Sequence, residues 1–183
     1  MESLTDIRRL GAGTFGRVNM VQHEKTKEVY ALKSQSKAHI VEKKLEDRVL
    51  QEMRIMQLLN HPFILTLHGT MQDERFIYFV MELVPGGEMF THLEQQVTFD
   101  EATAKFYAAQ IMLAFEYMHL NKIVYRDLKP ENVVLDKDGY CKLIDMGMAK
   151  KLSGNKTWTF CGTPDYLAPE IIQGQGHNKA VDY

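Results

Sequence analysis

Cysteine is scarce in this sequence, with only Cys141 and Cys161 among 183 residues. The two lie too far apart for the paired cysteines of a metal site, and the seven histidines show no ligand spacing. We therefore expect a reduced, intracellular protein in the cytoplasm, with no cysteine- or histidine-based metal centre.

The sequence also has no extended apolar segment and no large excess of basic or acidic residues. No apolar stretch approaches the length of a membrane span. The net charge of -2 gives no electrostatic reason to bind nucleic acid or an acidic membrane surface, so we expect neither as a partner. The remaining composition, 45% hydrophobic and 25% charged, is ordinary for a globular protein.

Strand-like patterns fill the first part of the chain, and one helix interrupts them. Apolar residues recur at three- and four-residue steps from Val41 to Leu59, which predicts a helix. Strands are predicted over residues 4–10, 18–22, 29–33, 64–67 and 76–82.

Helical patterns follow a break at Val84-Pro85-Gly86-Gly87. Thr98-Phe99-Asp100-Glu101 fits a capping box at the start of a helix. We predict a β-rich domain over 1–83 and a hinge with a helical domain over 84–183. The apolar stripe of the long helix consists of Ala102, Phe106, Ala109, Leu113 and Tyr117.

Gly11-Ala12-Gly13-Thr14-Phe15-Gly16 matches the phosphate-binding pattern G-x-G-x-x-G. A dinucleotide site needs a helix at the glycines, and a Walker A loop needs Lys-Ser/Thr after the last one. Here Arg17 to Val21 continues as a strand. The pattern favours a β-hairpin whose backbone lies over phosphates, although a plain flexible turn has the same sequence.

Lys33 and Glu52 are charged residues in apolar surroundings. Lys33 shares one strand face with Val29 and Ala31, and Glu52 lies inside the apolar stripe of the helix. Taken singly, each fits a surface charge on a long stem. Together they predict a buried ion pair between strand and helix, with Lys33 directed at nucleotide phosphates.

Three further motifs carry a resemblance to protein kinases. Tyr125 to Asn132, YRDLKPEN, resembles the kinase catalytic loop; Asp145-Met146-Gly147 resembles D-F-G; Ala168-Pro169-Glu170 is the A-P-E motif. The resemblance implies an α+β, two-lobed protein-kinase fold, with a complete β-rich N-lobe and an incomplete helical C-lobe.

The resemblance also implies ATP and Mg²⁺ as cofactors and assigns chemical roles. Asp127 would accept or orient the proton of the substrate hydroxyl, and Lys129 would neutralise charge on the transferring phosphate. Asn132 and Asp145 would hold Mg²⁺. The implied catalytic residues are Lys33, Glu52, Asp127 and Lys129.

The implied nucleotide site draws on both parts of the chain. Adenine would lie between Val18 and Ala31 on one side and Val134 on the other, with backbone hydrogen bonds from Glu82 and Val84. Each apolar position fits plain core equally well. The full set is Leu10, Gly11, Gly13, Gly16, Val18, Ala31, Lys33, Met81, Glu82, Val84 and Val134.

Lys129, two residues after Asp127, follows the serine/threonine pattern. Tyr125 in place of the common His, Gly86 to Phe90, and Thr157 to Pro164 resemble cyclic-nucleotide-dependent kinases, of the cAMP or the cGMP type. The resemblance implies a cyclic-nucleotide-binding regulatory subunit or domain as a partner.

Regulation and substrate binding are implied at further positions. Thr159 matches an activation-loop phosphorylation site, with Arg48, Arg126 and Lys150 as phosphate ligands. A solvated threonine is the alternative. Glu88 and Glu131 match residues that bind arginines upstream of the target Ser/Thr, although Glu88 also suits the first turn of a helix.

The sequence departs from the family at Met146, where Phe is usual, and at Tyr183, where Trp is usual. The family continues past Tyr183, and Glu170 lacks its arginine partner, so we expect a truncated chain that is unstable or inactive alone. A non-catalytic module that binds nucleotide or protein is the alternative to a kinase. Thr159 and the A-P-E motif disfavour a small-molecule phosphotransferase.

Overall fold

The computed structural model describes residues 4–13 and 16–183, and these form two compact units. The first unit contains the residues up to Leu58 together with Leu65–Val84, and the second contains Leu59–Ile64 and Pro85–Tyr183. Thr14 and Phe15 of the glycine motif lie outside the described residues. None of the helices in the described ranges has the length and apolar character that crossing a membrane requires.

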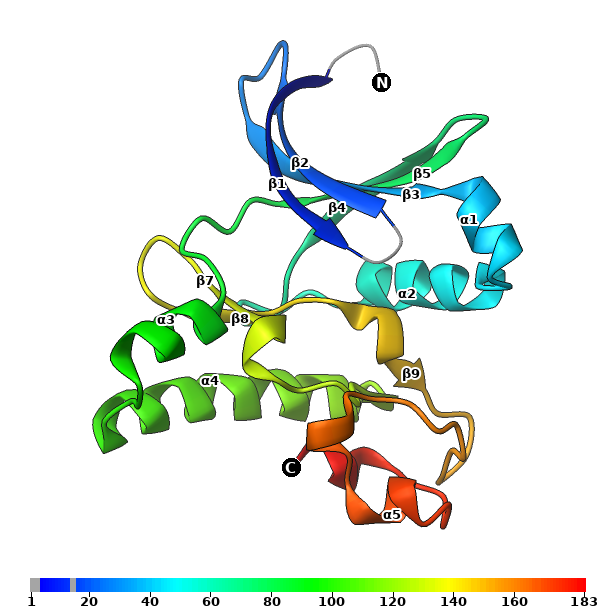
Figure 1. The fold of residues 1–183 in the computed structure, drawn as a ribbon, viewed down its shortest axis with the longest axis vertical. Helices are drawn as coiled ribbons and strands as arrows, with labels where there is room; N and C mark the ends of the chain where they lie inside the picture. The colour runs from blue at the N-terminus through cyan, green and yellow to red at the C-terminus, as the bar shows by residue number, and fades with distance from the viewer. Residues whose placement is uncertain (1–3, 14–15) are drawn as a thin grey trace. The chain divides into compact units, whose positions relative to one another are not determined.

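An antiparallel sheet of five strands, in the order β1-β2-β3-β5-β4, builds the first unit as far as it is described. Figure 1 shows these strands in blue to green, with two helices inserted between β3 and β4. The elements are β1 (Leu4–Gly13), β2 (Gly16–His23), β3 (Val29–Ser36), α1 (Lys37–Glu42), α2 (Glu46–Leu58), β4 (Leu67–Gln72) and β5 (Phe76–Glu82).

The two faces of this sheet carry different residues, as the alternation along β3 predicts. Leu32 packs with Val21 and Tyr78 in a buried cluster on one face. Ala31 and Lys33 point to the other face, where Ala31 pairs with Met81 on β5 and Lys33 with Val18 on β2. Directly opposed residues of an antiparallel ladder share a face, so this second face gathers the implied nucleotide-binding positions.

The single helix predicted from Val41 to Leu59 is wrong, because α1 ends at Glu42 and α2 begins at Glu46. Lys44 has a positive φ of 55°, and the Leu45 N–H donates to the Ile40 carbonyl at 2.9 Å. This is a Schellman-type end, which closes a helix and redirects the chain. The apolar period continues across the break, so periodicity alone could not reveal it.

The strand predicted over 64–67 is also misplaced. The ladder with β5 begins at Leu67 and continues to Gln72, whereas Ile64 forms only an isolated parallel bridge to Leu143. β4 is an edge strand with one neighbour, so its sequence, LHGTMQ, needs no continuous apolar pattern.

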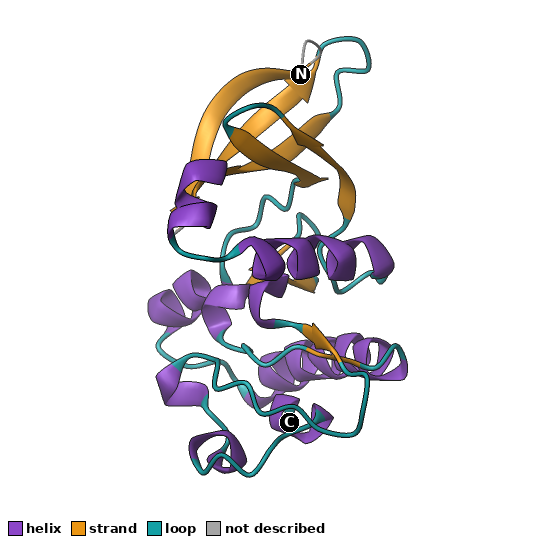
Figure 2. Ribbon diagram, turned by 90° about the vertical axis from the view of Figure 1, so that its right-hand side faces the viewer, coloured by secondary structure: helices purple, strands orange, loops and turns teal. Residues whose placement is uncertain are grey.

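Helices and loops make up most of the second unit, with two short strand pairs (Figure 2). The predicted α+β class, with a sheet-rich first part and a helical second part, is confirmed. The elements are α3 (Met89–Gln96), α4 (Glu101–Leu120), β6 (Ile123–Val124), η1 (Pro130–Asn132), β7 (Val133–Leu135), β8 (Cys141–Leu143), η2 (Met146–Met148), β9 (Lys150–Lys151), η3 (Pro164–Tyr166), α5 (Pro169–Ile172) and η4 (Lys179–Asp182).

Two predictions about α4 need correction. Its N-cap is Asp100, whose carboxylate accepts from the Thr103 N–H at 2.7 Å, rather than Thr98. The predicted apolar stripe lies largely on the solvent-exposed side of the helix, where Phe106 and Leu113 are 46% and 48% exposed. The buried residues are Gln110, Ala114, Phe115 and Met118. Apolar residues surround this helix, so the sequence could not select the face that packs.

Candidate active site

The glycine motif includes the end of β1 and the start of β2, where Gly13 pairs with Gly16 and Gly11 with Val18. A Cβ on Gly16 would lie 1.8 Å from the Ser34 carbonyl oxygen of the neighbouring strand. No side chain fits that gap. Glycine at position 16 is thus required by strand packing itself.

The ion pair predicted between Lys33 and Glu52 is present in the first unit. Lys33 Nζ on β3 lies 2.6 Å from Glu52 Oε1 on α2, with the two side chains 23% and 5% exposed. The ammonium also lies 5.6 Å from the ring centroid of Phe79, which is fully buried. The pair ties α2 to the sheet and leaves the Lys33 side chain partly open to a ligand.

The implied nucleotide-binding residues divide between the units. Val134 belongs to β7 in the second unit, and the others belong to the first. Ala31 and Met81 are buried. The Glu82 N–H donates to the Thr66 carbonyl at 3.0 Å, so this N–H serves the fold and only other groups of Glu82 are suited to adenine.

The stretch that resembles a catalytic loop is anchored through its backbone. The N–H groups of Tyr125 and Arg126 donate to the Asp182 carboxylate at 3.0 and 2.7 Å. Arg126 has a positive φ of 68°, and its Nε donates to the Met148 carbonyl at 2.8 Å. A non-glycine residue keeps such a backbone only where its surroundings fix it, so Asp182 holds the loop in this conformation.

Tyr125 is the first residue of this stretch and has no exposed surface. Its hydroxyl donates to the Ile144 carbonyl at 2.6 Å, just before Asp145. Burial raises the pKa of Tyr125 well above its ordinary value, and the negative charge of Asp145 raises it further. The phenol therefore stays protonated and acts as a structural donor.

Asp127 is buried and hydrogen-bonded on both carboxylate oxygens. The Asn132 amide donates to Oδ2 at 2.8 Å and to the Asp127 carbonyl at 2.9 Å. The Thr163 hydroxyl donates to Oδ1 at 2.6 Å and accepts from Lys129 Nζ at 2.8 Å. Lys129 Nζ also lies 3.5 Å from Asp127 Oδ2. These contacts fix the carboxylate in one orientation beside a cation.

Thr163 has no role in the sequence prediction, although it lies in the quoted stretch Thr157 to Pro164. Its hydroxyl bridges Lys129 and Asp127, although Thr163 lies 36 positions after Asp127 in the sequence. A threonine in a loop carries no pattern that reveals such a long-range contact.

Asn132 and Asp145 lie at the same end of the β7–β8 hairpin. Val133 pairs with Leu143, and the Ile144 N–H donates to the Asn132 carbonyl at 2.9 Å. Asp145 is exposed, and its Oδ1 accepts from the Gly147 N–H at 3.0 Å. An amide oxygen and a carboxylate suit Mg²⁺, which commonly takes one or two such ligands and completes its shell with waters and phosphate oxygens.

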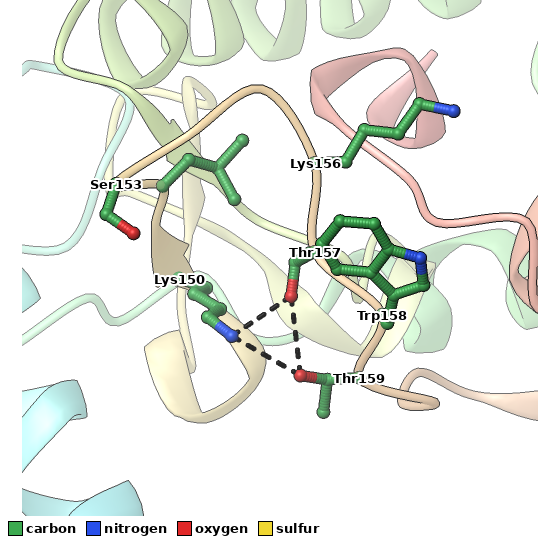
Figure 3. A pocket seen from close by; sticks show the side chains of 7 residues that line it. Lys150, Ser153, Lys156, Thr157, Trp158 and Thr159 are labelled. Carbon is green, nitrogen blue, oxygen red and sulfur yellow. Dashed lines mark hydrogen bonds between the residues drawn. The ribbon is translucent and has the colours of Figure 1, made fainter.

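Thr159 lies in a pocket beside Thr157 and Lys150 (Figure 3). Lys150 Nζ donates to the Thr157 hydroxyl at 3.0 Å and to the Thr159 hydroxyl at 3.4 Å. Thr157 is buried and its backbone pairs with His177, whereas Thr159 is exposed. Of these two hydroxyls, Thr159 is the one open to modification.

The other two expected phosphate ligands lie in different units. Arg126 is buried in the second unit, and Arg48 is half-buried on α2 of the first. His177 is buried near Arg126, and its Nε2 has no hydrogen-bond partner among the described residues. Burial lowers the pKa of His177, and the charge of Arg126 lowers it further, so this histidine is neutral.

The two acidic positions differ in burial. Glu88 is exposed at the N-cap of α3, but its side chain makes no capping hydrogen bond, so it does not serve the helix end. Glu131 is half-buried in η1, and its buried Oε2 has no hydrogen-bond partner in the described part of the chain. Glu88 also forms a backbone bridge to Val134, two residues after the end of η1, which ties the two acidic segments together.

Comparisons with known proteins agree with these motifs. The human protein cAMP-dependent protein kinase catalytic subunit PRKX is 48% identical over the whole chain, which covers 51% of that protein. The cAMP-dependent protein kinase catalytic subunit of Dictyostelium discoideum and mouse cGMP-dependent protein kinase 2 are also 48% identical, with 28% and 24% of their lengths covered. The chain thus spans about half, or less, of these relatives.

The family model described as the protein kinase domain matches residues 4–183. This match includes the Lys33–Glu52 pair of the first unit and the Asp127 cluster of the second. The chain therefore belongs to the protein kinase domain family.

Proposed function

We propose that this chain carries the catalytic activity of an ATP- and Mg²⁺-dependent serine/threonine protein kinase in the cytoplasm. The Asp127 cluster is the observation that carries the proposal. A buried carboxylate fixed by Asn132 and Thr163, with Lys129 beside it, is suited to orient an attacking hydroxyl next to transferring phosphate.

In the proposed reaction, the oxygen of a substrate serine or threonine attacks the γ-phosphorus of ATP. The bond from that phosphorus to the β–γ bridging oxygen breaks, and ADP leaves. Asp127 orients the hydroxyl and takes its proton, while Lys129 offsets negative charge on the transferring group. Lys33, held by Glu52, is the proposed contact to the nucleotide phosphates.

Asn132 and Asp145 are the proposed Mg²⁺ ligands. When bound, Mg²⁺ supplies positive charge that offsets the charge of the phosphate oxygens. The role of this chain is to present two oxygen ligands at one hairpin end, where the backbone bond from Ile144 to Asn132 fixes their spacing.

We propose that substrates carry arginines upstream of the target residue. The unpartnered, buried Oε2 of Glu131 supports this preference, because a buried carboxylate oxygen without a donor costs free energy until a cation reaches it. Glu88, whose carboxylate is not used for capping, is the second proposed acceptor. A guanidinium group suits both, since it donates two parallel hydrogen bonds to a carboxylate.

Phosphorylation of Thr159 is the proposed activating modification. The Lys150 ammonium already contacts its hydroxyl, and Arg126 lies in the same unit. A phosphate there would form charge-assisted hydrogen bonds and order the segment. The names of the relatives also support control by a cyclic-nucleotide-binding subunit or domain, of the cAMP or the cGMP type.

Transfer of labelled phosphate tests the proposal. The purified full-length protein is incubated with Mg²⁺ and γ-labelled ATP, using a serine peptide with two upstream arginines and a matched peptide with alanines. We expect transfer to the first peptide and weak transfer to the second. Asp127→Asn should reduce kcat by roughly 10²–10⁴ while ATP binding persists.

Glu131→Gln separates substrate recognition from chemistry. This variant should raise KM for the arginine peptide by about tenfold, the size expected for one lost charge-assisted contact, with little change for the alanine peptide. ATP binding by the wild-type protein without transfer to any peptide would instead support a non-catalytic binding module and overturn the kinase proposal.

A further inference from the structure

A chain of side-chain contacts runs from Tyr183 to the catalytic loop. His119 Nδ1 lies 3.1 Å from the Tyr183 hydroxyl, and His119 Nε2 lies 2.7 Å from Asp182 Oδ2. The side chains of His119 and Asp182 are only 4% and 0% exposed. Asp182 in turn accepts from the backbone N–H groups of Tyr125 and Arg126.

The contacts determine which ring nitrogen of His119 carries a proton. Asp182 accepts from two backbone N–H groups, and a carboxylate has no proton to donate, so a 2.7 Å contact requires a proton on Nε2. In the neutral ring, Nδ1 then has only a lone pair and accepts from the Tyr183 hydroxyl. The alternative tautomer would place a lone pair of the ring against the carboxylate.

The ring of His119 is also fixed sterically. It stacks on Phe115 at a centroid distance of 5.8 Å and an interplanar angle of 12°. Tyr183 meets Phe115 edge-on, with the ring centroids 6.2 Å apart. Packing thus sets where the imidazole lies, and contacts at both ring nitrogens, with Asp182 and with the Tyr183 hydroxyl, fix its orientation.

Asp182 is the acceptor that holds Arg126 at a positive φ, directly before Asp127. A change in the position or hydrogen bonding of this carboxylate would release that backbone and rotate the Asp127 side chain. A positioning effect of this kind alters the chemical step more than the binding of either substrate.

We propose that Tyr183 and His119 are positioning residues for phosphoryl transfer. The Tyr183 hydroxyl contacts Nδ1 of His119 and orients the ring so that Nε2–H points at Asp182, and His119 then holds Asp182 in place to accept from the catalytic loop. The inference rests on the proposed kinase function for its kinetic consequence, although the tautomer itself does not depend on activity.

Tyr183→Phe is the first test, because it keeps the ring on Phe115 and removes only the hydroxyl. In the full-length protein, we expect kcat to fall about threefold to tenfold, the size of one lost hydrogen bond. KM for ATP and for the arginine peptide should change less than twofold. Tyr140→Phe is the matched control: Tyr140 is a 46% exposed residue of the same unit, and the variant should retain wild-type kinetics.

His119→Ala and His119→Gln form the second test. Alanine removes the donor to Asp182 and should lower kcat more than Tyr183→Phe does. Glutamine can still present an N–H near the Nε2 position, so it should restore part of the rate. Amide exchange at Tyr125 and Arg126 should accelerate in the alanine variant and slow again in the glutamine variant.

Nitrogen-15 NMR of His119 gives a readout that needs no catalysis. In the wild-type protein Nε2 should carry a proton. In Tyr183→Phe that proton should persist, because Asp182 still accepts it, whereas the Nδ1 signal should shift because its hydrogen-bond partner is lost. A wild-type Nδ1–H tautomer, or an unchanged kcat in Tyr183→Phe, would overturn the positioning role. Failure of the wild-type protein to phosphorylate any peptide would overturn the proposed function instead, and the tautomer would still be measurable.

Discussion

Burial controls the reactivity of single side chains in this protein, as the two cysteines illustrate. Cys141 is fully buried at the start of β8, where its N–H donates to the Gln110 side chain at 2.7 Å. Burial raises the pKa of its thiol to about 12. Cys161 is only partly buried. Because the thiolate is the reactive form, the two cysteines should differ in their reaction with alkylating agents.

We predict that iodoacetamide at neutral pH modifies Cys161 in the folded protein and leaves Cys141 unmodified. Peptide mass spectrometry over a time course measures both rates in one sample. Denaturant removes the burial, so Cys141 should then react at a rate similar to Cys161. Equal rates in the folded protein would contradict the buried position of β8.

At the scale of elements, local backbone geometry rather than apolar periodicity determines where α1 ends. Lys44 adopts a positive φ of 55° at the end of α1, a conformation that costs most residues about 1–2 kcal/mol and glycine almost nothing. Lys44→Gly should therefore leave stability unchanged or raise it by up to about 1 kcal/mol, as the relief of strain exceeds the entropy cost.

Lys43→Gly is the matched control for that prediction. Lys43 has an ordinary φ of -90° at the C-cap of the same helix, so glycine there only adds freedom to the unfolded chain. We expect a loss of about 0.5–1 kcal/mol in the free energy of unfolding. Urea denaturation of both variants measures the difference, and a larger loss in Lys44→Gly than in Lys43→Gly would contradict the Schellman geometry.

Strands and helices were predictable to different degrees for physical reasons. β5 runs from Phe76 to Glu82 as predicted, because a central strand buried on both faces has a continuous apolar sequence. The edge strand β4 and the break at Lys44 were not predictable, since neither depends on an apolar pattern. The N-cap of α4 is Asp100 and not the predicted Thr98, because more than one residue there can act as a cap.

Over the whole molecule, the candidate site was also predictable from the sequence only in part. Short-range motifs identified Lys33, Asp127, Asn132 and Asp145, and the structure gives each a defined environment. Thr163 and His119 were missed, because their contacts join segments 36 and 63 positions apart and leave no periodic signal. Sequence thus predicts the proposed catalytic residues better than the residues that contact them from distant segments.

At the scale of the whole molecule, substitutions at the Lys33–Glu52 pair should affect both stability and phosphate transfer. Lys33→Met leaves Glu52, whose side chain is 5% exposed, without its cation. We expect the first unit to lose about 3 kcal/mol of stability, at the lower end for a broken buried pair because Lys33 is partly exposed. Phosphate transfer should be lost as well, which leaves the cause of inactivity ambiguous in the single variant.

The double variant Lys33→Met/Glu52→Leu resolves that ambiguity. Replacing both charges with apolar groups removes the uncompensated carboxylate, so most of the lost stability should return. Transfer should stay absent, because no ammonium remains to contact the nucleotide phosphates. Denaturation curves and phosphate transfer to the arginine peptide measure the two effects on the same samples. Recovery of both stability and transfer would mean that Lys33 serves only the fold, and the proposed contact with ATP would then be wrong.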